Sequence, residues 1–504
     1  MTTLPLVPVP VSVAVDEEAP PFRLFPGTVA SGEDAAAAAF ARILATRTGA
    51  HPDPPPGENR DGTPADARIR FVLEPGGPAE SSRIEVDAAS VLVRAPDAAG
   101  LFYAAQTLGQ LLRRDEAGWL LPAATIEDAP RFAYRGVMLD VARHFAPVAT
   151  VRAYIERAAA LKLNVLHLHL TDDQGWRLQL RSRPLLTERA SDSAVDGDPG
   201  GFYTAQDYRD IVAWAAAHHM TVVPEVDVPG HTHAVGLAYP ELAEVPVISD
   251  VVRAQGGAMP EAGRAYTGIA VGFSSLRIRD EATYDFLADV FGELASLTPG
   301  PYLHVGGDEC LGTDPADFAD FMARATRIVA DLGRIPIAWH EAGAATVDDT
   351  TVGQYWGYVR PRDGEDVPAR AFVANGSRLI LSPADAAYLD MKHDEHSTLG
   401  LTWADGPTSV ERAYSWEPAA VIDGVRDADI LGVEAPLWTE TVRSLADVDA
   451  LAFPRIAAIA EVAWSPAPTR DWSSFRARLG ALAPLWEAQG IGFFRSPEIE
   501  WTAR

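Results

Sequence analysis

The chain has 504 residues, more than one ordinary domain, and 47% of them are hydrophobic, which excludes a chain that is disordered throughout. Its formal net charge of -28 argues against nucleic-acid binding, because an acidic surface repels a phosphate backbone. The single cysteine, Cys310, excludes an internal disulfide bond.

Residues 1–20 contain several prolines and no basic segment, a pattern that does not match a secretory signal peptide. No stretch offers the roughly 20 uninterrupted apolar residues that a membrane-spanning helix needs. We therefore expect a cytoplasmic protein that binds no membrane, unless a signal that preceded this numbering has been removed.

The first part of the chain, 1–129, has the pattern of a small α/β domain. Short apolar runs bounded by turn residues predict strands over 68–73, 82–86 and 91–95. A helix is predicted over 98–114, where Leu101, Ala104 and Leu108 share one face. Proline and glycine residues make 51–66 a surface loop.

From Pro130 onward, short apolar runs alternate with helical patterns. The runs predict strands over 135–141, 164–170, 221–228, 302–305, 336–339, 352–356, 378–382 and 430–438. Helical periodicity is clearest over 149–163, 205–219 and 281–296. This alternation predicts a (β/α)8 TIM barrel over 130–475, with shortened helices between 340 and 430. We expect 476–504 to form a C-terminal helix that packs on the barrel.

Acidic and aromatic residues recur where the predicted barrel strands end. In chain order they are Asp140, Arg143, Asp172, Asp173, Asp227, His231, Asp308, Glu309, Trp339, Glu341, Trp356, Asp385, Tyr388, Asp390, Trp438 and Glu440. Barrel enzymes collect their chemistry at this end of the strands. Indole faces beside carboxylates and an arginine suit a sugar, whose C–H faces stack and whose hydroxyls hydrogen-bond. The sequence has no GxxxxGK[ST] motif for a phosphate.

Seven motifs carry a resemblance to a known family. They are YRGVMLDVARHF, LHLHLTDDQGWR, VPEVDVPGHTHA, YLHVGGDE, QYWG, LSPADAAYLDMK and GVEAPLWTET, in this order. They resemble the motifs of the family 20 glycoside hydrolases, the β-N-acetylhexosaminidases of bacterial type. The stretch LFYAAQTLGQLL resembles the small N-terminal domain of the same family. The loops at 191–201 and 254–268 match none of the family's motifs.

The resemblance implies an exo-acting, retaining enzyme that removes terminal N-acetylglucosamine or N-acetylgalactosamine without a cofactor or metal. In this family the 2-acetamido oxygen of the substrate attacks the anomeric carbon and forms an oxazolinium intermediate. Glu309 is then the general acid and base, and Asp308 orients the acetamido group and balances its charge. Tyr388 donates to the acetamido oxygen. The partner is an oligosaccharide with a terminal β-linked N-acetylhexosamine.

The same resemblance implies further roles around the sugar. Substrate-binding residues are Arg143, Trp339, Trp356, Asp390, Trp403, Trp438 and Glu440, with Trp403 on the leaving-group side. A supporting network around Glu309 consists of Asp172, Asp227 and His231. Glu309 needs neighbours that raise its pKa, so that it stays protonated near neutral pH, whereas Asp308 must stay ionised.

Other functions stay open at this stage. A metal-dependent hydrolase could use His167, His169, His231, His233 and Asp308 as ligands, although no lysine stands at a strand end to bridge two metals. His167 and His169 alternate with apolar neighbours on a strand, which favours hydrogen-bonded core residues over metal ligands, and Gln174 could fix a loop. A sugar-binding protein without activity is disfavoured by the presence of Glu309. A family relative with a specialised substrate, and either gluco or galacto preference, is compatible with the sequence.

Overall fold

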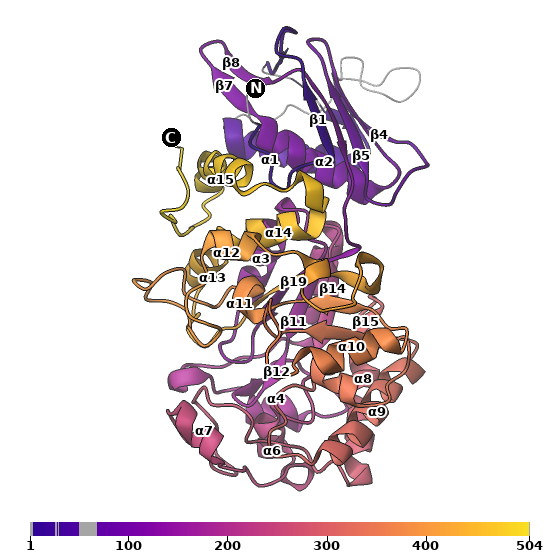
Figure 1. Ribbon diagram of the computed structural model, residues 1–504, viewed down its shortest axis with the longest axis vertical. Helices are drawn as coiled ribbons and strands as arrows, with labels where there is room; N and C mark the ends of the chain where they lie inside the picture. The colour runs from indigo at the N-terminus through magenta and orange to yellow at the C-terminus, as the bar shows by residue number, and fades with distance from the viewer. Residues whose placement is uncertain (1–3, 26–27, 29, 50–67, 503–504) are drawn as a thin grey trace. The chain divides into compact units, whose positions relative to one another are not determined.

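The computed structural model describes residues 4–25, 28, 30–49 and 68–502 (Figure 1). The chain forms two compact units, one comprising Met1–Ala133, Ala158–Leu163 and Phe453–Arg504, the other Tyr134–Arg157 and Asn164–Ala452. The predicted loop at 51–66 lies outside the described residues. The change of unit after Ala133 lies close to the predicted boundary at 129. Residues beyond Ala452 group with the N-terminal residues, and the packing of 476–504 on the barrel stays a prediction.

The first unit is built on a mixed six-stranded sheet with two helices on it (Figure 1). The strands are, in spatial order, β1 (Ser12–Val15), β9 (Ala124–Asp128), β5 (Ser82–Val86), β6 (Val91–Ala95), β4 (Ile69–Leu73) and β3 (Ala30–Gly32). The helices are α1 (Asp34–Thr48) and α2 (Ala98–Leu111). A second sheet consists of β2 (Phe22–Arg23), β8 (Gly118–Leu121) and β7 (Arg113–Asp115). The three predicted strands are confirmed, and the predicted helix ends three residues early.

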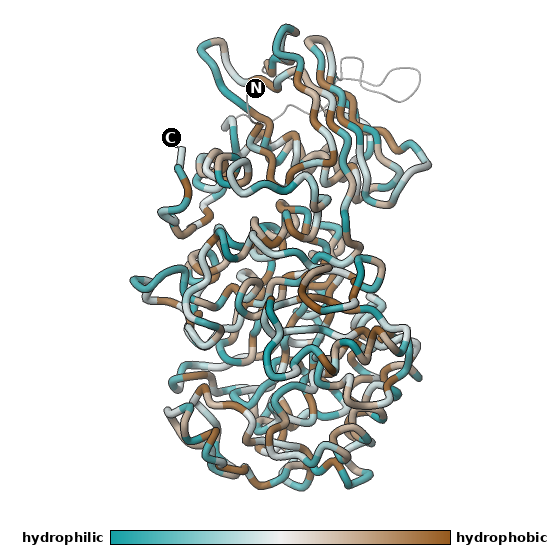
Figure 2. The backbone as a smooth tube through the Cα atoms, in the orientation of Figure 1, coloured by the Kyte–Doolittle hydropathy of each residue, from teal (hydrophilic) through white to brown (hydrophobic). Residues whose placement is uncertain are grey.

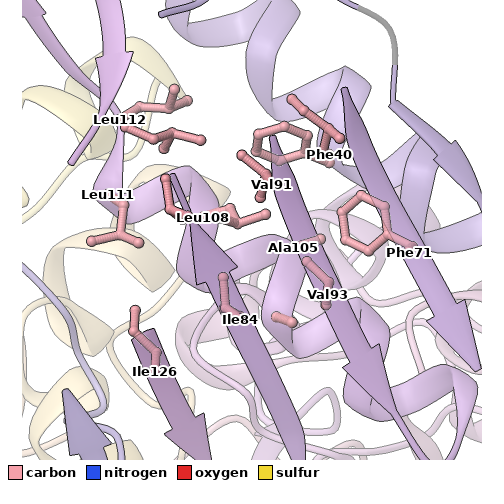
Figure 3. Packing of buried hydrophobic residues seen from close by; sticks show 14 of the residues in the cluster. Phe40, Phe71, Ile84, Val91, Val93, Ala105, Leu108, Leu111, Leu112 and Ile126 are labelled. Atoms are coloured by element: carbon pink, nitrogen blue, oxygen red, sulfur yellow. The ribbon is translucent and has the colours of Figure 1, made fainter. Parts of the chain in front are cut away.

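Successive side chains along each strand point to opposite faces of the sheet, so one face is apolar and packs against the helices. Along β6, Val91 and Val93 are fully buried, while Leu92 and Arg94 on the other face are partly exposed. The same alternation of apolar and polar residues is visible along the strands of this sheet in Figure 2. Figure 3 shows the core between sheet and helices, where Phe71 of β4 meets Phe40 of α1 with ring centroids 6.1 Å apart. Leu108 of α2 is fully buried in the same core.

The last part of the chain is tied into the first unit by buried charges. It contains α14 (Arg455–Trp464), α15 (Trp472–Gly480) and α16 (Ala483–Ala488). Arg478 binds both oxygens of Glu461 at 2.7 Å, and Glu461 also accepts the backbone N–H of Val9 at 2.9 Å. Asp128 accepts Lys162 Nζ at 2.6 Å and Trp464 Nε1 at 2.8 Å. These contacts join three distant parts of the sequence in one unit.

The second unit is a closed barrel of eight parallel strands, as predicted (Figure 1). The strands are β10 (Tyr134–Asp140), β11 (Val165–His169), β14 (Thr221–Glu225), β15 (Tyr302–His304), β16 (Ile335–Trp339), β17 (Val352–Tyr355), β18 (Leu379–Leu381) and β19 (Ile430–Leu437). Each of them overlaps one predicted strand.

The barrel helices are regular in the first half and shorter in the second, which confirms the predicted irregularity. The longer ones are α3 (Val148–Ala160), α5 (Ala205–Ala217), α8 (Glu281–Leu297) and α9 (Pro315–Asp331). The later ones are α10 (Asp366–Ala374), α11 (Ala384–Ala387) and α12 (Val410–Tyr414). In the part of the chain that the structure describes, no helix is both long and apolar enough to cross a membrane.

The barrel interior changes from apolar to charged along the strands. Side chains near the strand beginnings form an apolar layer of Tyr134, Val165, Val223, Ile337, Val352, Ile380 and Leu431. Beyond this layer lie His167, Glu225, His304 and Glu434, each fully buried. The site described below lies at the carboxyl ends of the strands, above this charged layer.

The first unit offers a matched pair of substitutions on one strand. Phe71 is 1% exposed and its neighbour Val72 is 37% exposed on the other face of β4. We expect Phe71→Ala to lower the free energy of unfolding by about 3–5 kcal/mol, because it leaves a cavity in the core, and Val72→Ala to lower it by less than about 1 kcal/mol. Urea unfolding followed by circular dichroism measures both. Equal losses would contradict the assigned core face.

Candidate active site

The loop after β15 brings two adjacent carboxylates to the barrel mouth. Gly306 and Gly307 have φ of 70° and 103°, and Glu309 has φ of 49°. A Cβ at Gly306 would lie 1.7 Å from Oδ1 of Asp227, so only glycine fits this turn. The turn leaves Asp308 buried, with 7% of its surface exposed, and Glu309 partly exposed. The two side chains therefore occupy different environments although they are adjacent.

A pocket of about 480 Å³ opens at these carboxylates. Its lining consists of Arg143, Gln255, Ile269, Val271, Asp308, Glu309, Trp356, Tyr388, Leu401, Thr402, Trp403, Trp438 and Glu440. Eight of the thirteen are residues that the sequence predicts for catalysis or sugar binding, and the ends of all eight barrel strands supply the site as a whole. Trp339 and Asp390, also predicted, are buried at 1% exposure behind this lining.

Aromatic rings form one wall of the pocket. Trp438 lies 6.2 Å from Trp339 and 6.3 Å from Tyr388, measured between ring centroids. Trp403 meets Trp356 and Tyr388 edge to face at 6.2 and 5.7 Å. The indole N–H of Trp356 donates to both carboxylate oxygens of Glu341, at 3.0 and 3.1 Å. An apolar enclosure with fixed rings of this kind suits the C–H faces and the methyl group of an acetylated sugar.

Arg143 and Glu440 provide the charged end of the pocket. The Arg143 guanidinium lies over the Trp438 ring at 4.7 Å and donates to Asp172 at 2.7 Å. Burial raises the pKa of Glu440 to about 7, although the charge of Arg143 opposes this. Oε2 of Glu440 has no hydrogen-bond partner among the residues described, so it is a buried acceptor that a ligand hydroxyl could occupy.

Asp172 connects the charged end to the catalytic carboxylates. Its Oδ2 accepts from Arg143 and from His169 Nε2, both at 2.7 Å, and its Oδ1 lies 3.2 Å from His231 Nδ1. Burial alone would raise the pKa of Asp172, but Arg143 and His231 hold it well below its ordinary value. A buried, permanently charged Asp172 therefore orients the cationic side chains on either side of it.

His231 lies between Asp172 and both carboxylates of the loop. Its Nε2 lies 3.6 Å from Oδ2 of Asp308 and 3.4 Å from Oε2 of Glu309. Burial favours the neutral ring, but Asp172, Asp308 and Asp227 together raise the pKa of His231 well above its ordinary value. The predicted supporting residues are thus brought together, with Asp227 accepting the backbone N–H of Gly307 at 3.0 Å.

The protonation of Asp308 differs from the expectation. Burial raises its pKa to about 7, with Glu309 and Glu341 adding to the rise and His231 opposing it. Burial and Asp308 raise the pKa of Asp227 well above its ordinary value as well. Three carboxyl groups, those of Asp172, Asp227 and Asp308, face the one imidazolium of His231. In the unliganded site Asp308 and Asp227 therefore hold protons more strongly than ordinary aspartates, which the sequence does not predict. A ligand N–H donated to Asp308 would favour its ionised form.

His167 and His169 belong to the barrel core, which is the simpler of the two explanations given above. His167 lies 3.1 Å from Glu225 and 2.9 Å from Glu434, and His169 hydrogen-bonds Glu225 and Asp172. Although burial opposes it, these carboxylates raise the pKa of His167 to about 10 and of His169 to about 9. A protonated imidazole has no lone pair for a metal.

The other predicted metal ligands are also engaged. His233 Nε2 hydrogen-bonds the backbone carbonyl of Arg264 at 2.7 Å. Of the five, only His231 and Asp308 fall in one described group of possible ligands, with Asp227, whose atoms lie within 4.8 Å of one another. The five residues proposed for a metal site therefore do not form one ligand set.

Sequence reasoning missed two parts of the site. Glu341 was placed at a strand end but not given a contact, whereas it fixes Trp356 and its own pKa is raised to about 8, mainly by burial. Gln255, Ile269 and Val271 line the pocket from a loop without a family motif. The position of Glu341 at a strand end indicates a site residue but not its contact with Trp356, and no local pattern marks the loop residues.

Models of known families and solved structures agree with this geometry. The model of the glycosyl hydrolase family 20 catalytic domain matches residues 132–315 and 313–467, and that of the family's domain 2 matches residues 3–129. A β-N-acetylhexosaminidase of Cellulomonas fimi is 39% identical over 505 residues, covering 99% of this chain and 98% of that protein. A β-hexosaminidase of Vibrio furnissii is 32% identical and covers 75% of this chain and 64% of that protein.

Two solved structures are similar along nearly the whole chain. A family 20 β-N-acetylglucosaminidase has a TM-score of 0.90 at 58% identity and covers 99% of this chain and 100% of its own. The Streptomyces plicatus N-acetyl-β-hexosaminidase in complex with Thio-NAglucal has a TM-score of 0.89 at 43% identity, covering 99% and 98%. The family model over the barrel and the relatives along the whole chain identify the protein as a glycoside hydrolase. The chain belongs to glycosyl hydrolase family 20.

The raised pKa of Asp308 predicts a pH-dependent cost in stability. Between the ordinary pKa of an aspartate and about 7, the folded carboxyl is protonated and the unfolded one is ionised, so stability falls as pH rises through this range. Asp308→Asn mimics the protonated form. We expect it to stabilise the protein more at pH 8 than at pH 4.5, by on the order of 2 kcal/mol.

Thermal melts of wild type and Asp308→Asn at both pH values measure this difference. Asp331→Asn, on an exposed residue at the end of α9, is the control for a general loss of negative charge. A melting-temperature difference that does not change with pH would show that the carboxyl of Asp308 is not protonated in the folded protein.

Proposed function

We propose that the protein is an exo-acting, retaining β-N-acetylhexosaminidase that removes terminal non-reducing N-acetylglucosamine or N-acetylgalactosamine by substrate-assisted catalysis. The observation that carries this is the placement of the buried Asp308 and the partly exposed Glu309 around one imidazole, at the mouth of a tryptophan-lined pocket. Similar proteins support it, among them a Streptomyces plicatus variant in complex with the product GlcNAc and an N,N'-diacetylchitobiase of Vibrio harveyi.

In the first step, the 2-acetamido oxygen of the substrate attacks the anomeric carbon as the glycosidic bond breaks. Glu309, on the solvent side of the pair, gives its proton to the departing oxygen. The products are an oxazolinium ring on the sugar and a neutral alcohol. In the second step, the ionised Glu309 takes a proton from water, which attacks the anomeric carbon and reopens the ring with net retention.

Asp308 acts on the acetamido group in this scheme. Its Oδ1 is buried and accepts no hydrogen bond from any described residue, so it can accept the acetamido N–H. Ionised Asp308, itself 7% exposed, then balances the positive charge that develops on the oxazolinium ring. Tyr388 donates to the acetamido oxygen, and Trp339, Trp356 and Trp438 surround the methyl group.

His231 keeps the two carboxylates in their different roles. Its imidazolium, held charged by Asp172, lies within 3.6 Å of both Asp308 and Glu309. The charge stabilises Asp308 as a carboxylate when the acetamido N–H arrives, and it stabilises Glu309 after proton transfer. Asp227 completes this network by fixing the loop at Gly307.

Arg143, Glu440 and Asp390 bind the sugar hydroxyls at the closed end, and Trp403 stacks on the leaving-group side. The substrate is an oligosaccharide with a terminal β-linked N-acetylhexosamine. The cytoplasmic location expected from the sequence stays a prediction.

Removal of the general acid should affect substrates according to their leaving groups. We expect Glu309→Gln to lower kcat/KM for N,N'-diacetylchitobiose by about 10²–10⁴-fold, because a sugar hydroxyl leaves only when protonated. A 2,4-dinitrophenyl glycoside needs no proton and should lose much less in its first step. Steady-state and burst kinetics measure both. Glu261→Gln, on an exposed residue outside the pocket, is the control. Near-wild-type cleavage of chitobiose by Glu309→Gln would refute the role.

Substrate assistance predicts a dependence on the acetyl group. Each fluorine on the acetyl methyl makes the acetamido oxygen less nucleophilic, so kcat should fall steeply from acetyl to trifluoroacetyl. A protein nucleophile would leave kcat nearly unchanged across the series. Mass spectrometry after incubation with a 2-fluoro glycoside gives an independent test. A stable sugar adduct on Asp308 or Glu309 would indicate an ordinary two-carboxylate retaining enzyme.

A further inference from the structure

One carboxyl group beside the pocket has no part in the proposed mechanism, that of Glu341. It belongs to η3 (His340–Ala344), the turn that follows β16 at the carboxyl end of the strand. Its two oxygens accept the indole N–H of Trp356 at 3.0 and 3.1 Å. The backbone N–H groups of Glu309 and of Glu341 itself also hydrogen-bond this carboxyl group. Glu341 therefore connects a ring of the pocket wall with the loop that carries the general acid.

The surroundings of Glu341 supply hydrogen-bond donors but no permanent cation. In the part of the chain that the structure describes, no lysine or arginine forms an ion pair with it. The titratable groups that face it from other elements are the carboxyls of Asp308 and Glu309 and the hydroxyl of Tyr388. Each of these three groups carries either a negative charge or none. An ionised Glu341 would therefore add a negative charge to a site that is already acidic.

His340, the neighbour of Glu341 in the same turn, offers an acceptor for a proton on this carboxyl group. Its Nδ1 lies 3.3 Å from Oε2 of Glu341, is buried and has no hydrogen-bond partner among the described residues. Burial lowers the pKa of His340 to about 4, although the charge of Glu365 opposes this, so the ring is neutral near pH 7. One nitrogen of a neutral imidazole accepts a hydrogen bond, and a buried acceptor without a donor costs free energy. A protonated Glu341 provides the missing donor.

The charge balance of the site favours the same protonation state. In the proposed reaction Asp308 is ionised when it holds the acetamido N–H, and Glu309 is ionised once it has given up its proton. The imidazolium of His231 lies within 3.6 Å of both and supplies one positive charge for the two. Burial raises the pKa of Glu341 to about 8, and the charge of Glu309 adds to the rise, although hydrogen bonds from Trp356 and the backbone oppose it. A third carboxylate would find no counter-ion here.

We propose that Glu341 is a positioning residue that works as a neutral carboxylic acid, donating its proton to Nδ1 of His340 and accepting the indole N–H of Trp356. In this state it holds the pocket wall beside Glu309 without adding a negative charge to the site. Its proton stays on the enzyme throughout the reaction. The inference rests on the proposed function, because that function assigns Glu309 as the general acid and Trp356 to the acetamido pocket.

Two substitutions of Glu341 separate a neutral acid from a carboxylate. Glu341→Leu removes both hydrogen bonds, and we expect it to lower kcat/KM for N,N'-diacetylchitobiose about ten- to hundredfold at pH 6.5, because the pocket wall is displaced. Glu341→Gln keeps both, since its amide oxygen accepts from Trp356 and its amide nitrogen donates to His340. We expect it to restore kcat/KM to within about threefold of the wild type. In a Trp356→Phe background, which lacks the indole N–H, Glu341→Leu should cost less than about threefold.

The dependence of stability on pH reports the proton itself. Between the ordinary pKa of a glutamate and about 8, folded Glu341 is protonated and unfolded Glu341 is ionised, so the stability of the wild type falls as pH rises through this range. Glu341→Gln lacks this loss. Its melting temperature should therefore rise relative to that of the wild type by about 2 °C or more between pH 5 and pH 8.5. Asp349→Asn, on an exposed residue of the same connection between β16 and β17, is the matched control and should change neither kcat/KM nor this difference.

An ionised Glu341 would give the opposite results. Glu341→Gln would then lose as much kcat/KM as Glu341→Leu, and its melting temperature would fall further below that of the wild type as the pH rises. Either result would overturn the inference and leave the proposed function intact, and so would a Glu341→Leu variant that is as active as the wild type. If the wild type does not cleave chitobiose at all, the proposed function fails instead, so the two failures are distinguishable.

Discussion

The site depends on one buried charge, the carboxylate of Asp172. It faces Arg143 at the sugar-binding end and His231 at the catalytic end, and His169 supports it from the barrel core. Without it, three cationic side chains would face one another in a space that excludes water. Breaking a buried ion pair by removing one partner costs about 3–5 kcal/mol. Binding of the sugar hydroxyls and proton transfer at Glu309 are therefore coupled through a single side chain.

Asp172 is in turn the outermost member of a charged column through the barrel. Glu434 and Glu225 alternate with His167 and His169, and His304 Nδ1 lies 3.0 Å from Glu225. Burial lowers the pKa of His304, which favours its neutral ring. Along the rest of the column the signs alternate, so each charge has an opposite neighbour that offsets part of its desolvation. Apolar side chains fill only the layer at the strand beginnings. Part of the barrel core is therefore charged and not apolar, and these charges hold the catalytic groups. Such a departure from an apolar core is expected at a functional site.

The sequence predicts the barrel well because its strands are short apolar runs that end in acids and aromatic residues, a signal that depends only on neighbouring positions. It predicts the residues of the sugar site through the motifs at those ends. Contacts between distant segments cannot be predicted in this way. The hydrogen bonds of Glu461 with Val9 and Arg478 help to group the end of the chain with its beginning, but no local sequence pattern indicates them. The raised pKa of Asp308 likewise depends on burial and on Glu341, which no spacing in the sequence reveals.

One segment beside the pocket, residues 248–273, has a consequence for how such an enzyme can change; it lines the pocket through Gln255, Ile269 and Val271. Its apolar cluster is made of its own residues, and Gln174 and His233 bind its backbone carbonyls, which every residue type provides. The His233 ring also packs against the rings of Tyr266 and Phe273. Side chains at positions such as 269 can therefore vary without loss of the support beneath them. The fold thus separates catalysis from substrate preference. Buried, paired charges fix the acetamido site, whereas the side chains of the neighbouring pocket wall can be exchanged. Exchange of this one segment between related chains offers a route to new oligosaccharide preferences with the catalytic chemistry left in place.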